Sequence, residues 1–190
     1  MADSRMLLLR RFLVLIVLFF WQGGFTFYAA AVVPVGQQVF GHLRQGFVTR
    51  QVTVYLNHAG AVALAVLVWD LLAVCDLSGW RRRTRWLLWA GMIVSLAVLY
   101  WLHGRMDELL ETDGLIILDR DAFRPRHRLY LWISTVQWAW GLLSLILSLA
   151  AWRAEDRLTT NRAAAPTSQE NQEHASIGIR REETNVRRGQ

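Results

Sequence analysis

Four of the five histidines are the clearest candidates for a functional site, because imidazole binds metals and haem. They are His42, His58, His103 and His127. Helix bundles hold such cofactors through histidines on facing helices. The spacing of these histidines along the sequence does not indicate a metal site, since HxxxH and HxxEH motifs and a cysteine partner are absent. His58, His103 and His127 are therefore speculative metal ligands, for copper or for the iron of a haem. Interfacial histidines that bond to water or loop carbonyls are the competing interpretation.

Asp70 is the second chemical outlier, because it lies inside an apolar stretch. A carboxylate in a membrane helix is costly, and it is by default a candidate functional residue. It lies near the end of that stretch, about one to two helical turns from water. We expect it to pair with Arg10, Arg11 or Arg153. A proton or ion relay is the alternative.

Nothing in the sequence is typical of an enzyme. It has no nucleophile–base arrangement, Gly-rich phosphate loop or paired-carboxylate motif. Acidic residues gather in segment 107–121, where we expect a solvated loop, with weak binding of a divalent cation as the alternative. The single Cys75 excludes an internal disulfide and a cysteine-based metal cluster. It is either a buried or interfacial thiol or a lipidation site. We expect no enzymatic activity.

Four apolar segments must position these residues, at about 12–34, 52–75, 86–103 and 127–152. Each is long enough to cross a bilayer, the third only just. With 54% hydrophobic residues and ten Trp, the chain is typical of an integral membrane protein. The sequence predicts an all-α fold, an antiparallel four-helix bundle in the membrane. A secretory signal is the alternative for the first segment, but its apolar part exceeds the roughly 7–15 residues of a signal core.

The fourth segment is polar or small along one line and apolar elsewhere. Successive members are three or four residues apart, which places them on one helix face. The line consists of His127, Tyr130, Ser134, Gln137, Gly141, Ser144, Ser148 and Ala151. In lipid, small and polar residues favour contact with neighbouring helices. We interpret the line as a packing seam and expect hydrogen bonds among Gln22, Ser134 and Gln137 across it.

The chain divides into a membrane domain, residues 1–153, and a polar tail, residues 154–190. We expect the tail to be disordered, because it has too few large apolar residues to offset the entropy of ordering. The net charge is +6, and the cations are arginines that gather at the ends of apolar segments, four of them in an expected short basic loop from Asp76 to Arg85. Arginines placed there anchor and orient helices. The expected partner is therefore the lipid bilayer, with other membrane proteins or further copies of this chain as additional partners, and not nucleic acid.

The distribution of arginine predicts the orientation in the membrane. Four crossings place both termini on one side, which carries ten Arg near the segment ends, against seven on the other side. The positive-inside rule then makes both termini cytoplasmic. The four histidines named above share the opposite, outer side. The compact sequence is typical of a bacterial protein, so we expect it in the plasma membrane.

The first apolar segment reads FFWQGGFTFYAAAVVPVG. Its Trp, Gly-Gly, aromatic residues and Val-Val-Pro resemble the opening of the transmembrane protein 205-like domain family, four-helix membrane proteins of undefined activity. Phe123 and His127 match that family's aromatic residue and histidine at the last helix. Arg128, Leu129 and Tyr130 depart from it, because a small or amide residue is expected there. The match covers about residues 10–153.

The Trp-x-Gly-Gly pattern is also similar, more faintly, to the copper-resistance D membrane domain, which would imply the histidines as copper ligands. Neither resemblance supplies a catalytic residue. We expect a small multi-pass membrane protein without enzymatic activity, which acts by interaction or by organising the membrane. A transporter or a metal- or ion-handling protein that uses the outer histidines is the first alternative. A haem-bearing redox subunit is the second.

Overall fold

A computed structural model describes the backbone of residues 2–74, 76, 78–111 and 116–188, and the side chains of residues 5–74, 76, 78–110 and 118–161. The elements in chain order are α1 (Ala2–Phe27), the π-helical η1 (Tyr28–Val32), α2 (Val33–Ala73), α3 (Gly79–Asp107), β1 (Leu110–Glu111), β2 (Ile116–Ile117) and α4 (Arg120–Arg188). The fold is all-helical, as predicted, apart from a two-residue antiparallel β pair between α3 and α4.

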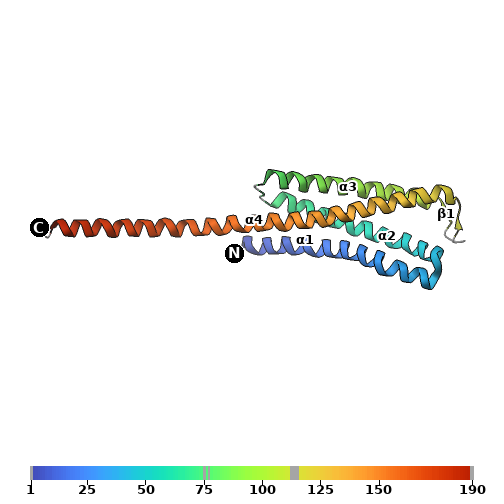
Figure 1. The fold of residues 1–190 in the computed structure, drawn as a ribbon, viewed down its shortest axis with the longest axis horizontal. Helices are drawn as coiled ribbons and strands as arrows, with labels where there is room; N and C mark the ends of the chain where they lie inside the picture. Colours follow the sequence, from blue (N-terminus) through green and yellow to red (C-terminus); the bar gives the residue numbers. More distant parts are fainter. Residues whose placement is uncertain (1, 75, 77, 112–115, 189–190) are drawn as a thin grey trace.

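The helices run side by side, each opposite to the one before it (Figure 1). The chain turns back at Gly41, which lies inside α2 and has φ 78° and ψ 162°. Glycine adopts this left-handed conformation at little cost. We call this end, together with the end of α3, the β pair and the start of α4, the turn end. The termini end holds the start of α1, the end of α2, the start of α3 and α4 near Trp152.

The first helical segment is longer than the sequence predicted. We expected it to end at Pro34, but it continues to the turn at Gly41. The backbone N–H of Val33 bonds to the carbonyl of Tyr28, five residues earlier, which is the wide turn of η1. Such a turn directly before Pro34 accommodates a residue that lacks an N–H and whose ring would otherwise meet the preceding turn.

The turn is held by polar contacts between its two arms. The hydroxyl of Tyr28 donates to Oγ1 of Thr49 at 3.1 Å, and Nε2 of Gln45 lies 3.4 Å from that hydroxyl. The Gln45 amide fills the place that a Cβ at Gly36 would take. A glycine at position 36 is therefore needed for the close approach of the arms.

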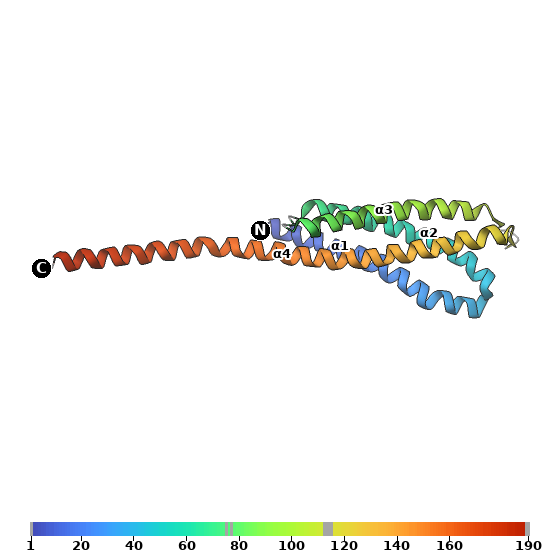
Figure 2. The ribbon, with the colours of Figure 1, turned by 45° about the horizontal axis from the view of Figure 1, so that its top comes forward.

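The third and fourth helices also differ from their predicted bounds. We expected helix over 86–103, with Asp76 to Arg85 as a basic loop, but α3 begins at Gly79 and its first turns carry those arginines. The tail is helical as far as Arg188 and extends away from the other helices (Figures 1 and 2). The expected disorder of 154–190 is thus not confirmed, and the tail's Ala, Arg, Glu and Gln all favour helix.

Many large apolar side chains lie outside, and several polar ones lie inside beside an apolar core that includes Leu18, Leu64 and Met92. Phe19 is 80% exposed and Leu87 73% exposed, whereas Asp70 is completely buried. The other buried polar residues are Arg10, Gln22, Gln45, Asn57, Arg85, Ser134, Gln137, Ser144 and Ser148. Among the described residues, three helical stretches are long and apolar enough to cross a membrane: Arg5–Ala73, Gly79–Asp107 and Arg120–Asn161. The first includes the turn at Gly41.

Candidate functional site: a polar line between two ends

The polar line on α4 faces the other helices, as predicted. Tyr130, Ser134, Gln137, Ser144 and Ser148 are all buried. Three features follow this line from one end to the other. They are an ion-pair cluster at the termini end, a small pocket in the middle and a large chamber at the turn end.

Asp70 is the centre of the ion-pair cluster. Its Oδ2 accepts a hydrogen bond of 2.6 Å from Arg85, and Nε of Arg10 lies 3.1 Å from its Oδ1. The indole N–H of Trp152 donates to the same carboxylate at 3.0 Å. Arg85 also reaches Oγ of Ser148 at 3.3 Å. One buried carboxylate therefore joins α1, α2, α3 and α4.

A second layer of charges surrounds this centre. Arg10 bonds to Oε2 of Glu155 at 2.7 Å, and Arg11 bonds to Oδ1 of Asp156 at 2.7 Å. The Arg11 guanidinium also lies 5.6 Å from the ring centroid of Trp152, within cation–π range. Three arginines thus face three carboxylates, so the cluster balances its charge. Two buried guanidinium groups and an indole N–H contact the carboxylate of Asp70, and such a fully contacted group suits a structural lock better than a proton relay.

The predicted pairing of Asp70 was therefore partly right. Arg10 is a partner, whereas Arg11 bonds to carboxylates of α4 instead. Arg85 is the partner that the sequence analysis missed, because it was assigned to a loop. A signal for it exists, since Arg85, Met92, Leu99 and Met106 lie seven residues apart and are all buried. That spacing extends the inward face of α3 back to Arg85.

Asp76 forms a separate ion pair in the connection between α2 and α3. Its Oδ1 accepts hydrogen bonds from Arg81 at 2.6 Å and from the backbone N–H of Ser78 at 2.9 Å. Burial alone would raise the pKa of Asp76, but these bonds and the charges of Arg81 and Arg85 outweigh it, so the pKa lies below the ordinary value of 3.8. The pair fixes the start of α3. Cys75, beside it, lies outside the described residues.

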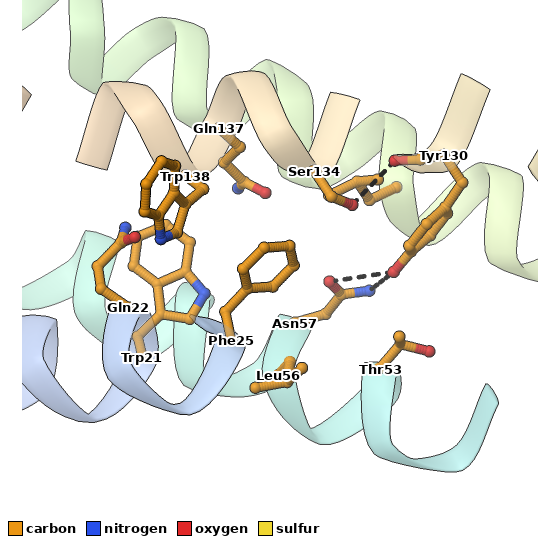
Figure 3. A pocket seen from close by; sticks show the side chains of 11 residues that line it. Trp21, Gln22, Phe25, Thr53, Leu56, Asn57, Tyr130, Ser134, Gln137 and Trp138 are labelled. Carbon is orange, nitrogen blue, oxygen red and sulfur yellow. Dashed lines mark hydrogen bonds between the residues drawn. The ribbon is translucent and has the colours of Figure 1, made fainter. Parts of the chain in front are cut away.

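The middle pocket lies among α1, α2, α3 and α4 (Figure 3) and has a volume of about 30 Å³. At one side, Nδ2 of Asn57 donates to the hydroxyl of Tyr130 at 3.1 Å, which joins α2 to α4. The hydroxyl of Ser134 donates back to the Tyr130 carbonyl at 2.9 Å. A space of this size is enough for roughly two water molecules.

Gln22 lines this pocket, and its side-chain amide has no hydrogen-bond partner among the described residues. Its Nε2 fills the place that a Cβ at Gly141 would take. The predicted bonds among Gln22, Ser134 and Gln137 were wrong, because Gln137 donates instead to the Met92 carbonyl at 3.3 Å. A buried amide without a protein partner is a normal site for water.

A much larger cavity than the middle pocket, of about 680 Å³, lies at the turn end, and we call it the turn-end chamber. Figure 2 shows the turn inside α2 diverging there from α3 and α4. The residues that line the chamber are Ala29, Val33, Gln37, His42, Leu43, Gln45, Gly46, Phe47, Thr49, Arg50, Thr53, His103, Met106, Asp107, Leu110, Arg120, Phe123, Arg124, His127, Tyr130 and Leu131. Thr53 and Tyr130 also line the middle pocket, so the two spaces adjoin.

The histidines divide between the chamber and the outer surface. His103 and His127 line the chamber with His42, but His58 lies outside it. The His58 ring nitrogen Nδ1 is 2.7 Å from the carbonyl of Val54 in its own helix. The structure therefore does not bring His58, His103 and His127 together as a ligand set. In the described part of the chain, no group of three His, Cys, Asp or Glu side chains could hold a metal ion.

The two histidines on α3 and α4 have other neighbours. His103 lies 3.6 Å from a carboxylate oxygen of Asp107, and His127 stacks on Phe123 with ring centroids 5.7 Å apart. Asp107 also accepts a 2.6 Å hydrogen bond from Arg50. These contacts make the histidines part of the chamber wall. The acidic segment 107–121 supplies Asp107 to it, and the side chains of 111–117 lie outside the described residues.

Comparisons of the chain with protein families, with curated proteins and with solved structures give no match. The resemblance to the transmembrane protein 205-like domain family, and the fainter one to the copper-resistance D membrane domain, therefore rest on their short motifs alone.

Proposed function

We propose that this chain is a multi-pass integral membrane protein, an antiparallel bundle that crosses the bilayer four times. The apolar outer surface supports this proposal, since Phe19, Phe20, Leu72 and Leu87 face outward while the carboxylate of Asp70 is buried. The arms of the turn at Gly41 supply two of the crossings, and α3 and α4 supply the other two. The tail beyond residue 153 lies outside the membrane, because its composition is polar.

We place the termini end in the cytoplasm of a bacterial cell and the turn end outside the plasma membrane. The arginines of α1, of the start of α3 and of the first part of the tail support this orientation. A reporter enzyme fused after Gln190 should be active only in the cytoplasm. Activity of a periplasmic reporter at that position would overturn the orientation.

The function that the geometry supports best is the binding of a small molecule in the turn-end chamber, without chemical conversion of that molecule. The observation that carries this proposal is the chamber's volume of about 680 Å³. Ligand sites in proteins commonly have volumes of about 300–1,000 Å³ and combine apolar walls with a few polar groups. We expected a protein without enzymatic activity that acts by interaction. This proposal makes that expectation specific, because it names a small molecule as the partner.

A cavity-filling variant tests this proposal. A Cβ built at Gly46 meets no atom within 4 Å, and Gly46 lines the chamber. Gly46→Leu should therefore occupy the chamber without disturbing the helix. Native mass spectrometry of the purified protein should show a bound small molecule that Gly46→Leu loses. Gly104→Leu is the matched control, because Gly104 has equal space but does not line the chamber. Equal occupancy in both variants would contradict the proposal.

Transport is a second candidate function, which one observation favours. The chamber adjoins the middle pocket, and Ser144 and Ser148 continue the polar line to Arg85. The ion-pair cluster closes the line at the termini end. In a Cys75→Ala background, a transporter should allow Ser144→Cys to react with membrane-impermeant thiol reagents from each side in turn. Complete protection from both sides would count against transport.

A further inference from the structure

We infer that the turn-end chamber binds an acyl-chain amphiphile with an anionic head group. This inference rests on the proposed binding function and adds the chemical class of the ligand. It depends on two properties of the chamber, which are its apolar walls and the sign of the charge at the start of α4.

The two arms joined at Gly41, which we call the first hairpin, form a chamber wall that is suited to an acyl chain. Val33, Leu43 and Phe47 line the chamber from α2, and Leu131 lines it from α4. Val33 lies before the turn at Gly41, while Leu43 and Phe47 lie after it, so both arms contribute. Apolar side chains that surround a hydrocarbon chain remove it from water. A small, fully polar solute would leave these walls without a partner.

Cations outnumber anions in the rest of the lining. Arg120 and Arg124 line the chamber from the first turns of α4, and both are exposed. Within the side chains that the structure describes, neither forms an ion pair. Asp107 is the acidic residue among the lining residues, and Arg50 already bonds to it at 2.6 Å. The chamber therefore offers two guanidinium groups for an anion.

Among the described side chains, Asp119 and Asp121 do not neutralise Arg120 and Arg124 at the chamber wall. Asp119 uses its carboxylate to accept hydrogen bonds from the backbone N–H groups of Asp121 and Ala122, at 3.0 and 2.9 Å. Neither Asp119 nor Asp121 lines the chamber. A guanidinium binds carboxylate or phosphate oxygens through paired, charge-assisted hydrogen bonds. A head group that carries such oxygens can reach Arg124 while its acyl chain follows the apolar wall.

The test uses the full chain in nanodiscs of phosphatidylcholine, a lipid without net charge. A dansylated undecanoic acid is the fluorescent probe, and laurate, dodecanol and dodecyltrimethylammonium compete with it. The three competitors share a chain length and differ in the charge of the head group. Laurate should displace the probe at a concentration about tenfold lower than the other two, which corresponds to one charge-assisted contact.

Arginine variants locate the head group. Arg124→Gln should weaken laurate binding about tenfold and leave dodecanol unchanged, because the lost contact is made only to the anion. Arg128→Gln is the matched control, since Arg128 is an exposed arginine one turn further along α4 that does not line the chamber. Equal effects of the two variants would overturn the inference.

The outcomes separate this inference from the proposed function. If all three competitors displace the probe equally and Gly46→Leu weakens them all, the chamber binds amphiphiles but the anionic class is wrong. If Gly46→Leu changes nothing, the chamber is not the binding site and both proposals fail. Adding phosphatidylglycerol to the nanodisc distinguishes the source of the ligand. Displacement by this lipid assigns the site to an anionic membrane lipid, and displacement by laurate alone assigns it to a free fatty acid.

Discussion

The indole N–H of Trp152 donates to Oδ1 of Asp70 at 3.0 Å and so joins residues 82 positions apart. Because Arg85 approaches the other carboxylate oxygen at 2.6 Å, Asp70 bonds to α3 and α4 at the same time. A buried ion pair adds little net stability compared with apolar residues of similar size, yet removing one of its members is costly. The cluster therefore fixes which helices meet at the termini end.

Replacing Asp70 should strongly destabilise the helical domain. In Asp70→Leu, Arg10 and Arg85 keep their buried charges without the central carboxylate, and the cost is about 3–5 kcal/mol. Asp156→Asn is the control, because the Asp156 side chain is 56% exposed and its ion pair with Arg11 contributes at most about 1 kcal/mol. Denaturant-induced unfolding of the purified protein measures both. Combining Asp70→Leu with Arg85→Met should recover part of the loss, and no recovery would argue against unpaired charge as its cause.

Gly141 and Gly23 should respond in opposite ways to added side chains. Gly141→Leu should destabilise the protein by about 1–3 kcal/mol, because the Gln22 amide already fills the place of the new Cβ. Gly23→Ala should stabilise α1 by up to about 1 kcal/mol, since no atom lies within 4 Å of a Cβ there and alanine favours helix. Leu142→Ala serves as a second comparison on α4. Equal tolerance of Gly141→Leu and Leu142→Ala in thermal unfolding would show that the polar line is not a packing surface.

Asn57 and Tyr130 should be coupled. Tyr130→Phe removes the hydroxyl that accepts from Asn57 at 3.1 Å and leaves a buried amide, which costs about 1–3 kcal/mol. Asn57→Leu should likewise destabilise, and the double variant should cost less than the sum of the single ones. The coupling free energy from this double-mutant cycle should be about 0.6–2 kcal/mol, typical of hydrogen bonds between membrane helices. Simple additivity would show that the two side chains act independently.

Acid should weaken the connection between α2 and α3 through Asp76. The pKa of this carboxyl is lower in the folded protein than its ordinary value of 3.8, chiefly because Arg81 and Ser78 outweigh the effect of burial. A lowered pKa means that the stabilisation is complete above about pH 5 and is lost as pH falls through 3.8 and below. Thermal unfolding of the parent chain should therefore depend more steeply on acid pH than that of Asp76→Asn. Asp121→Asn, which changes an exposed carboxylate, should leave the slope as in the parent chain.

Hydropathy identified the helical class and the inward face of α4, because both depend on patterns that local sequence contains. The position of the first turn could not be predicted in the same way. Pro34 is a usual stop for a helix, but η1 accommodates it and Gly41 makes the turn instead. That choice depends on Gln45 packing over Gly36, a contact between residues on opposite arms.

Charged residues were harder to predict than apolar ones. The neighbours Arg81, Arg82 and Arg83 are typical of a basic loop, so the sequence predicts Arg85 to lie in one. In the structure Arg85 is instead buried, where it bonds to Asp70. Topology correctly placed His103 and His127 at one end and left the direction of their side chains open. His58 lies outside the chamber, because its ring bonds to Val54 in its own helix and packs edge-on against Tyr100 of α3. Side-chain direction depends on helix rotation, which composition does not determine.

Gly41 is the one residue inside α2 whose φ and ψ are not helical. The two helical arms of the first hairpin therefore meet at a single residue. The hairpin therefore has no slack loop that could fold over the chamber or withdraw from it. Any change in the chamber's width must come from a change in the tilt of whole helices. In a bilayer, helix tilt responds to the thickness of the hydrocarbon layer. In the membrane setting proposed above, the capacity of the chamber would therefore follow the thickness of the bilayer.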